Sequence, residues 1–159
     1  MAIKESEFFH GTVLSRILRK KEPTSLEKIE SELGDKWSSY IINDRTIIHI
    51  SHRKSTRTGL SKYWYFSFTP DQLKELKHSF PYKHTVALVC LDANSHLDQA
   101  EICFLNKKQT NQLIDPKSKA DQHIRITLEN KQHFKVYGSL RDWHHALTID
   151  RNQIDQVDM

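Results

Sequence analysis

The segment from Thr85 to Leu91 constrains the fold more than any other part of this 159-residue chain. It reads TVALVCL and is almost continuously apolar. A strand with one face in water alternates apolar and polar residues, whereas an unbroken apolar run is typical of a strand buried on both faces. We therefore expect a central strand whose sheet is covered on both sides.

Six further strands are predicted from β-branched and aromatic residues bounded by polar turns. They are Ser39 to Asn43, Thr46 to Ser51, Tyr63 to Phe68, Ala100 to Leu105, His123 to Leu128 and His133 to Tyr137. In the third of these, Trp64 and Phe66 alternate with Tyr65 and Ser67, so the face with Trp64 and Phe66 should be buried and the other face less so.

Helices are predicted where apolar residues recur at helical spacing behind a capping residue. They cover residues 8–18, 24–33, 69–80 and 106–114; the second depends on a capping box between Thr24 and Glu27. The chain has no internal repeat and no Gly/Ser-rich linker. We expect one α+β domain over residues 1–159, with a mixed β-sheet of about seven strands flanked by three to four helices.

The chain carries no recognisable membrane or export signal. No apolar run approaches the roughly 20 residues that span a bilayer, and the first seven residues lack the apolar stretch of a signal peptide. We expect a cytoplasmic protein with no membrane partner. Cys90 and Cys103 both lie in apolar strand-like runs, so we expect them to be buried, reduced and unreactive.

The motifs of common enzyme classes are missing. Ten histidines raise the question of a metal site, but their spacing matches no common ligand pattern. His49 and His52 are three apart near a strand end and so point to opposite faces, and His144 and His145 are adjacent. A Gly-x-Ser-x-Gly motif and a glycine-rich phosphate loop are also absent. We predict no metal site, no cofactor and no catalytic residue.

The order of elements from Phe8 to Leu91, with one extra helix inserted, resembles the αβββαβ core of PD-(D/E)XK nucleases. The resemblance implies a divalent cation held by carboxylates, for which Asp44 and Glu7 are the candidates. The Glu-x-Lys motif of these enzymes is missing, because neither His49-Ile50-Ser51 nor the segment from Tyr63 to Phe68 contains a carboxylate. A metal-dependent nuclease is therefore only the second alternative.

Short segments distributed along most of the chain share a further pattern. They are Phe9-His10-Gly11 with Leu14 and Leu18, Tyr40-Ile41-Ile42-Asn43, Trp64-Tyr65-Phe66-Ser67-Phe68, Ala87-Leu88-Val89-Cys90, Ile102-Cys103-Phe104-Leu105 and Gly138-Ser139. This pattern resembles a family of small uncharacterised bacterial proteins. The resemblance implies a single bacterial domain and says nothing about chemistry.

The functional hypothesis comes from the distribution of charge. The net charge is +4, and no acidic residue lies between Arg45 and Pro70. Within this stretch we expect an exposed loop from His52 to Lys62, followed directly by the aromatic residues Tyr63, Trp64 and Tyr65. Such a loop can neutralise phosphates while an aromatic ring stacks on a base.

We therefore predict a non-catalytic binding or accessory protein whose leading partner is DNA or RNA. The predicted contact residues are Arg53, Lys54, Arg57, Lys62 and His52. A restriction or phage-defence setting would suit such a ligand. The first alternative is a protein–protein interaction module that binds a partner protein or a second copy of this chain.

Overall fold

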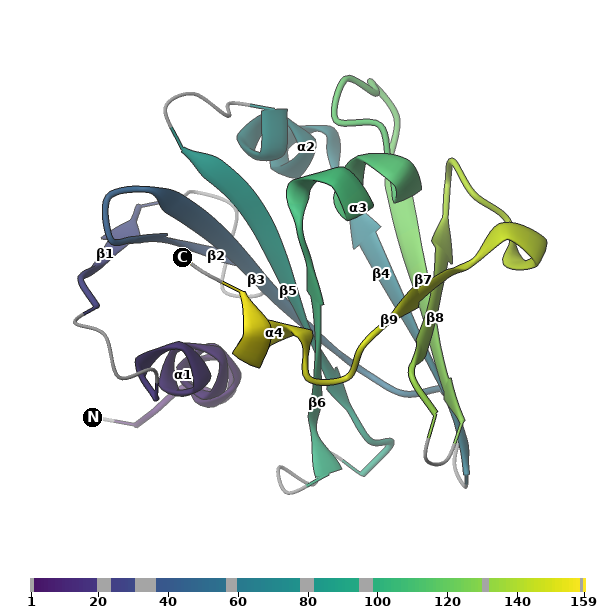
Figure 1. The fold of residues 1–159 in the computed structure, drawn as a ribbon, viewed down its shortest axis with the longest axis horizontal. Helices are drawn as coiled ribbons and strands as arrows, with labels where there is room; N and C mark the ends of the chain where they lie inside the picture. Colours follow the sequence, from purple (N-terminus) through teal and green to yellow (C-terminus); the bar gives the residue numbers. More distant parts are fainter. Residues whose placement is uncertain are drawn as a thin grey trace.

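The computed structural model describes residues 2–19, 24–30, 37–56, 60–77, 82–94, 99–129, 132–157 and 159. Within these ranges the fold is α+β, as predicted, with nine strands arranged in two sheets (Figure 1). The first sheet has the order β1-β2-β3-β5-β6 and the second the order β4-β7-β8-β9. The strands therefore form two stacked sheets rather than one.

The first sheet is mixed, because β3 and β5 are parallel and its other neighbours are antiparallel. Its strands are β1 (Leu26–Ile29), β2 (Trp37–Ile42), β3 (Thr46–Lys54), β5 (Lys83–Leu91) and β6 (Glu101–Leu105). The second sheet is antiparallel throughout. Its strands are β4 (Ser61–Phe68), β7 (Gln122–Glu129), β8 (Phe134–Gly138) and β9 (Leu147–Ile149).

Four α-helices accompany the sheets in the described part of the chain. They are α1 (Glu5–Leu18), α2 (Pro70–Lys77), α3 (Lys107–Leu113) and α4 (Gln153–Gln156), and a 3₁₀ turn covers Trp143–His145. The helix α3 begins with the predicted capping box, in which the Asn106 side chain accepts from Gln109 N at 2.8 Å and the Gln109 side chain accepts from Asn106 N at 3.0 Å.

The strand β5 is central, as its sequence predicts, and every residue from His84 to Leu91 is buried. Its two faces belong to two different cores. Val86, Leu88 and Cys90 pack between the two sheets, whereas Ala87, Val89 and Leu91 pack against α1 and the C-terminal segment. An unbroken apolar run is needed because neither face of this strand meets water.

The layers thus follow the order α1, first sheet, second sheet (Figure 1). Phe9, Val13 and Ile17 form the buried stripe of α1. The core between the sheets contains Trp64 and Phe66, each 0% exposed, which confirms the predicted alternation along β4. No helix of the described chain packs over the outer face of the second sheet (Figure 1).

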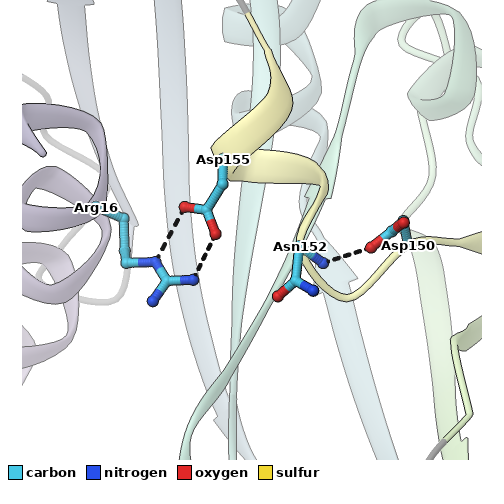
Figure 2. Close-up of polar contacts among 4 residues, drawn as sticks. All are labelled: Arg16, Asp150, Asn152 and Asp155. Carbon is cyan, nitrogen blue, oxygen red and sulfur yellow. Dashed lines mark hydrogen bonds and ion pairs between the residues drawn. The ribbon is translucent and has the colours of Figure 1, made fainter. Parts of the chain in front are cut away.

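The C-terminal segment closes over the α1 side of the first sheet. The guanidinium of Arg16 donates two hydrogen bonds to the Asp155 carboxylate, at 3.2 and 2.6 Å, and so joins α1 to α4 (Figure 2). Asn152 N donates to the Asp150 side chain at 2.7 Å in the turn before α4 (Figure 2). The Met159 carbonyl accepts from Arg45 Nη2 at 2.8 Å. These contacts hold the segment in place, although no helix or strand is predicted there.

The predicted helix over residues 24–33 is wrong where the structure describes it. Residues Leu26–Ile29 form β1, which pairs with β2 so that Leu26 lies opposite Ile42 and Ile29 opposite Ser39. Leu26 is 37% exposed and Glu27 and Lys28 are exposed too, so β1 itself buries little apolar surface. Pairing with the edge of β2 satisfies the backbone instead, and tertiary context outweighs the local capping signal. Residues 31–33 lie outside the described ranges.

The predicted exposed loop from His52 to Lys62 is also too long. The strand β3 continues to Lys54, which pairs with Leu91 of β5, and β4 begins at Ser61. Backbone pairing with neighbouring strands extends both elements through polar residues whose sequence looks loop-like. Only Ser55, Thr56 and Leu60 of the described residues remain between the strands.

Candidate nucleic-acid interface

The outer face of the second sheet displays polar and aromatic side chains. Strand residues point alternately to the two faces, so the buried Ile124, Ile126 and Leu128 of β7 leave the intervening side chains outside. We call this outer surface the open face. Its members are Tyr63, Tyr65 and Ser67 from β4, His123, Arg125 and Thr127 from β7, and Lys135 and Tyr137 from β8.

The register of the three strands arranges these side chains in rows. Tyr65 lies opposite Arg125, and Arg125 lies opposite Tyr137, so the central row is tyrosine, arginine, tyrosine. The next row joins Tyr63 through Thr127 to Lys135 in the same way. Aromatic and cationic groups therefore alternate across the sheet at neighbouring positions.

Tyr65 is held between two neighbours on the open face. Its ring stacks on His123 with centroids 5.6 Å apart and an interplanar angle of 18°, and the Arg125 guanidinium lies 5.4 Å from its centroid. His123 Nδ1 is in turn 3.1 Å from Ser139 Oγ. Tyr65 nevertheless stays 41% exposed. The row is therefore preorganised and still open to a ligand.

Arg125 carries the positive charge next to Tyr65, because the neighbouring His123 is uncharged at pH 7. Burial and the nearby Arg125 both lower the pKa of His123 below its ordinary value of 6.5, so the imidazole is neutral at pH 7. Lys135 adds a second cation one row away, where its Nζ donates to Thr148 Oγ1 at 2.8 Å. The open face combines fixed positive charge with neutral rings.

A tryptophan extends the open face beyond β8. The Trp143 ring meets Tyr137 edge-on, with centroids 5.4 Å apart and an interplanar angle of 78°, and it is 51% exposed. The 3₁₀ turn that carries it is capped by Asp142, whose carboxylate accepts from His145 N at 3.1 Å. Arg141 Nη1 also donates to the His145 carbonyl at 3.0 Å. The exposed indole is thus presented from a well-bonded turn.

The structure distributes the predicted contact residues over several surfaces. Lys54 is exposed at the end of β3. Arg53 is half-buried between the sheets, with its guanidinium 5.7 Å from the Phe66 centroid and Nη1 donating to the His52 carbonyl at 2.7 Å. Burial lowers the pKa of Arg53. The four predicted residues that the structure describes therefore do not form one patch.

The remaining predicted residues point elsewhere or are not described. The His52 ring packs on Phe9, with centroids 4.7 Å apart, on the α1 side of the first sheet. Lys62 is half-buried and lines a depression that also contains Glu129 and Arg151. Arg57 lies outside the described residues.

The predicted basic segment, His52 to Lys62, is hydrogen-bonded to Tyr63 of β4 through Ser55 and Thr56. Thr56 N donates to the Tyr63 carbonyl at 3.1 Å, and Tyr63 N donates to Ser55 Oγ at 3.2 Å. The chain that follows Lys54 therefore runs along the edge of β4 at the position of Tyr63. Ser55 and Thr56 thus attach the end of β3 to the edge strand of the second sheet.

Sequence reasoning missed Arg125, Lys135, Tyr137 and Trp143 as partners of Tyr65. The alternation of HIRITL and the adjacent aromatic and cationic residues of FKVYG were visible signals. They could not be joined to Tyr65, because nothing local states that β4 pairs with β7, which starts more than 50 residues after β4 ends.

A buried cluster of one serine and two histidine side chains joins β2, β3 and β5. Ser39 Oγ is 2.7 Å from His49 Nδ1, and His49 Nε2 is 2.9 Å from His84 Nδ1. A serine next to a histidine resembles a nucleophile and its base, but Ser39 is 1% exposed. Burial and the neighbouring His84 lower the pKa of His49 from 6.5 to about 3. Such an imidazole is a poor general base near pH 7, and we interpret the cluster as structural.

Glu7 and Asp44 are the acidic residues considered for a cation site. Glu7 caps the start of α1, and Asp44 lies in a turn. Glu7 Oε2 accepts from Lys4 N at 2.7 Å at the start of α1, and Asp44 lies in the β2–β3 turn with a φ of 52°. Among the described residues, no group of three or more His, Cys, Asp or Glu side chains is arranged to hold a metal ion. In the same ranges, no helix is long and apolar enough to cross a membrane.

Comparisons with protein-family models, with curated proteins and with solved structures gave no match. The function must therefore be inferred from the geometry of the open face and of the surfaces next to it.

Proposed function

We propose that this protein binds single-stranded nucleic acid through the open face. The observation that carries the proposal is the central row, in which Arg125 lies between Tyr65 and Tyr137 on a sheet face that no described helix covers. Exposed aromatic rings beside cations are the two components that proteins use to hold single strands. A four-stranded sheet is a suitable platform for this mode of binding.

Stacking would supply the first part of the affinity. Tyr65 and Trp143 are 41% and 51% exposed, and both are held by neighbouring rings. A base that stacks on such a ring gains about 1–3 kcal/mol. Only unpaired bases offer their faces, since a duplex keeps them stacked on one another. The open face should therefore prefer single strands to duplexes.

Positive charge would supply the second part. Arg125 and Lys135 lie on the open face, and Lys54 lies exposed where the basic segment approaches β4. Each phosphate contact releases condensed counterions, so binding should weaken as salt rises. The net charge of +4 favours approach to a polyanion over long distances.

Fluorescence anisotropy with labelled single-stranded DNA, single-stranded RNA and duplex DNA at two salt concentrations tests the proposal. Trp143→Ala and Tyr65→Ala should each weaken single-strand binding roughly 5- to 150-fold, the equivalent of one lost stack. Leu26→Ala is the control, because Leu26 is an apolar residue of similar exposure (37%) on β1 of the first sheet. It should bind as the unaltered protein does.

Two results would contradict the proposal. The first is the absence of binding to any single strand at low salt. The second is binding that Leu26→Ala and Trp143→Ala leave equally strong. A preference for duplex DNA that survives both open-face variants would instead point to the basic segment alone.

A further inference from the structure

The outer surface of α1 exposes large apolar side chains. Ile3, Phe8 and Leu18 are 66%, 50% and 51% exposed. Phe8 and Leu18 lie on α1 outside its buried stripe of Phe9 and Val13, and Ile3 lies just before the helix. Ile3 and Phe8 line the same hollow, and contiguous exposed apolar residues mark an interaction surface more often than isolated ones do.

This surface is also hollowed. A groove of about 530 Å³ runs along it, lined by Ile3, Phe8, Gly11, Thr12, Ser15 and Arg19 among others. A Cβ atom added to Gly11 would meet no atom within 4 Å, so the space above the helix backbone is open at this point. A neighbouring helix could therefore approach closely while Phe8 supplies the apolar contact.

The charges of α1 are separated along its length. Glu5 and Glu7 lie in the first turn, whereas exposed Arg19 follows the last turn and lines the groove. The other cation of that turn, Arg16, is already engaged by Asp155 (Figure 2). A surface that is acidic at one end and basic at the other complements itself when two copies meet in antiparallel orientation.

We propose that a second copy of this chain docks on the outer surface of α1, with the two α1 helices antiparallel. Thr12 lies midway between Glu5 and Arg19 in the sequence, so a crossing near Thr12 sets Glu5 of each copy beside Arg19 of the other. The same crossing directs each Phe8 toward the groove of the second copy.

The length of α1 limits the area of the proposed dimer interface and therefore the expected affinity of the dimer. A helix of 14 residues is about 21 Å long, and one such pair falls at the small end of specific interfaces, where association is weak and reversible. The dimer is therefore expected in the micromolar range or above. α1 and the second sheet lie on opposite sides of the first sheet (Figure 1), so both open faces stay accessible. The inference does not depend on the proposed function.

Sedimentation velocity from micromolar to near-millimolar protein tests the inference. The unaltered chain should shift from monomer to dimer over this range. Gly11→Arg should weaken the dimer at least about tenfold, because the new side chain fills the groove, while helix propensity favours arginine over glycine. Leu60→Ser is the control, since Leu60 is 74% exposed at the start of β4, and it should leave the dimer unchanged.

Charge reversal tests the antiparallel orientation. Glu5→Lys and Arg19→Glu should each weaken the dimer several-fold, and the double variant should restore it to near the original strength. Both reversals oppose the helix dipole, so a restored dimer cannot come from a more stable helix. A chain that stays monomeric throughout, a dimer indifferent to Gly11→Arg, or a double variant as weak as the single ones would overturn the inference.

Discussion

His49 and His84 share a hydrogen bond of 2.9 Å between Nε2 and Nδ1 in the core between the sheets, with their rings stacked at a 20° interplanar angle. Their relative exposures are 2% and 4%. Since Ser39 Oγ meets the other nitrogen of His49 at 2.7 Å, both nitrogens of this ring have a partner. A neutral imidazole donates through one nitrogen and accepts through the other, so the neutral form suits this site.

This arrangement predicts that the protein loses stability in acid. The folded-state pKa of His49 is about 3, against 6.5 when the ring is solvated, so between these values the unfolded chain binds a proton that the native protein does not. The free energy of unfolding should therefore fall as the pH drops through this window, by about 1.4 kcal/mol per pH unit for one proton. Urea titrations from pH 7 to pH 4 measure the slope. His49→Gln should have a smaller slope than the unaltered protein, and equal slopes would exclude His49 as the cause.

Tyr65 and Phe66 are adjacent in β4, but replacing Phe66 should reduce folding stability whereas replacing Tyr65 should reduce nucleic-acid binding. Phe66 is 0% exposed in the core between the sheets, so Phe66→Ala should cost about 3–5 kcal/mol of unfolding free energy. Tyr65→Ala removes a ring from the open face and should cost far less stability while it weakens nucleic-acid binding. Chemical denaturation together with anisotropy separates the two effects. A melt of Phe66→Ala that barely moves would remove β4 from the core.

Arg53 and Lys54 form a second pair of neighbours with different roles. Arg53 packs over Phe66 and donates to the His52 carbonyl, so Arg53→Ala should lower the unfolding free energy by about 1 kcal/mol or more through lost packing. Lys54 is exposed, and Lys54→Ala should leave stability within about 0.5 kcal/mol of the original. Lys54→Ala should instead reduce the salt dependence of nucleic-acid binding. Equal melting temperatures for the two variants would show that Arg53 is not part of the core.

Two glycines should respond differently to alanine. A Cβ atom at Gly138 would collide with the backbone carbonyl of His123 and approach the Leu113 carbonyl to 2.9 Å, so Gly138→Ala should cost about 2–4 kcal/mol. Gly11 has open space in front of it, and Gly11→Ala should add up to about 1 kcal/mol through helix propensity. Thermal melts at low protein concentration compare them. A stable Gly138→Ala variant would mean that β7 and α3 can move apart at this point.

The sequence predicted individual elements better than their partners. The apolar run of β5 and the alternation of Trp64 and Phe66 with Tyr65 each depend on one strand and its own two faces, and both were confirmed. The division into two sheets depends on β4 leaving β3 to pair with β7. The pairing of β4 with β7 depends on packing between segments that are distant in the sequence, and no local sequence pattern predicts it.

The candidate site was predicted only in part, because its residues come from strands whose pairing the sequence does not show. Tyr65 was recognised as an aromatic beside basic residues, but its neighbours Arg125 and Tyr137 come from strands whose register the sequence does not state. Arg53 and Lys54 looked alike as consecutive cations. Their difference arises because β3 continues through them and turns alternate side chains inward and outward.

The two cysteines provide a reporter of motion in this molecule without any substitution. Cys90 and Cys103 are free, 0% exposed, and contribute to the core between the sheets. Burial raises the pKa of both thiols, so neither presents the thiolate that alkylating reagents attack. Labelling can proceed only when the two sheets separate far enough to admit water and reagent. The rate of thiol labelling under native conditions therefore measures how often the sandwich opens, and a ligand on the open face that slows it must do so by stabilising the closed sheets.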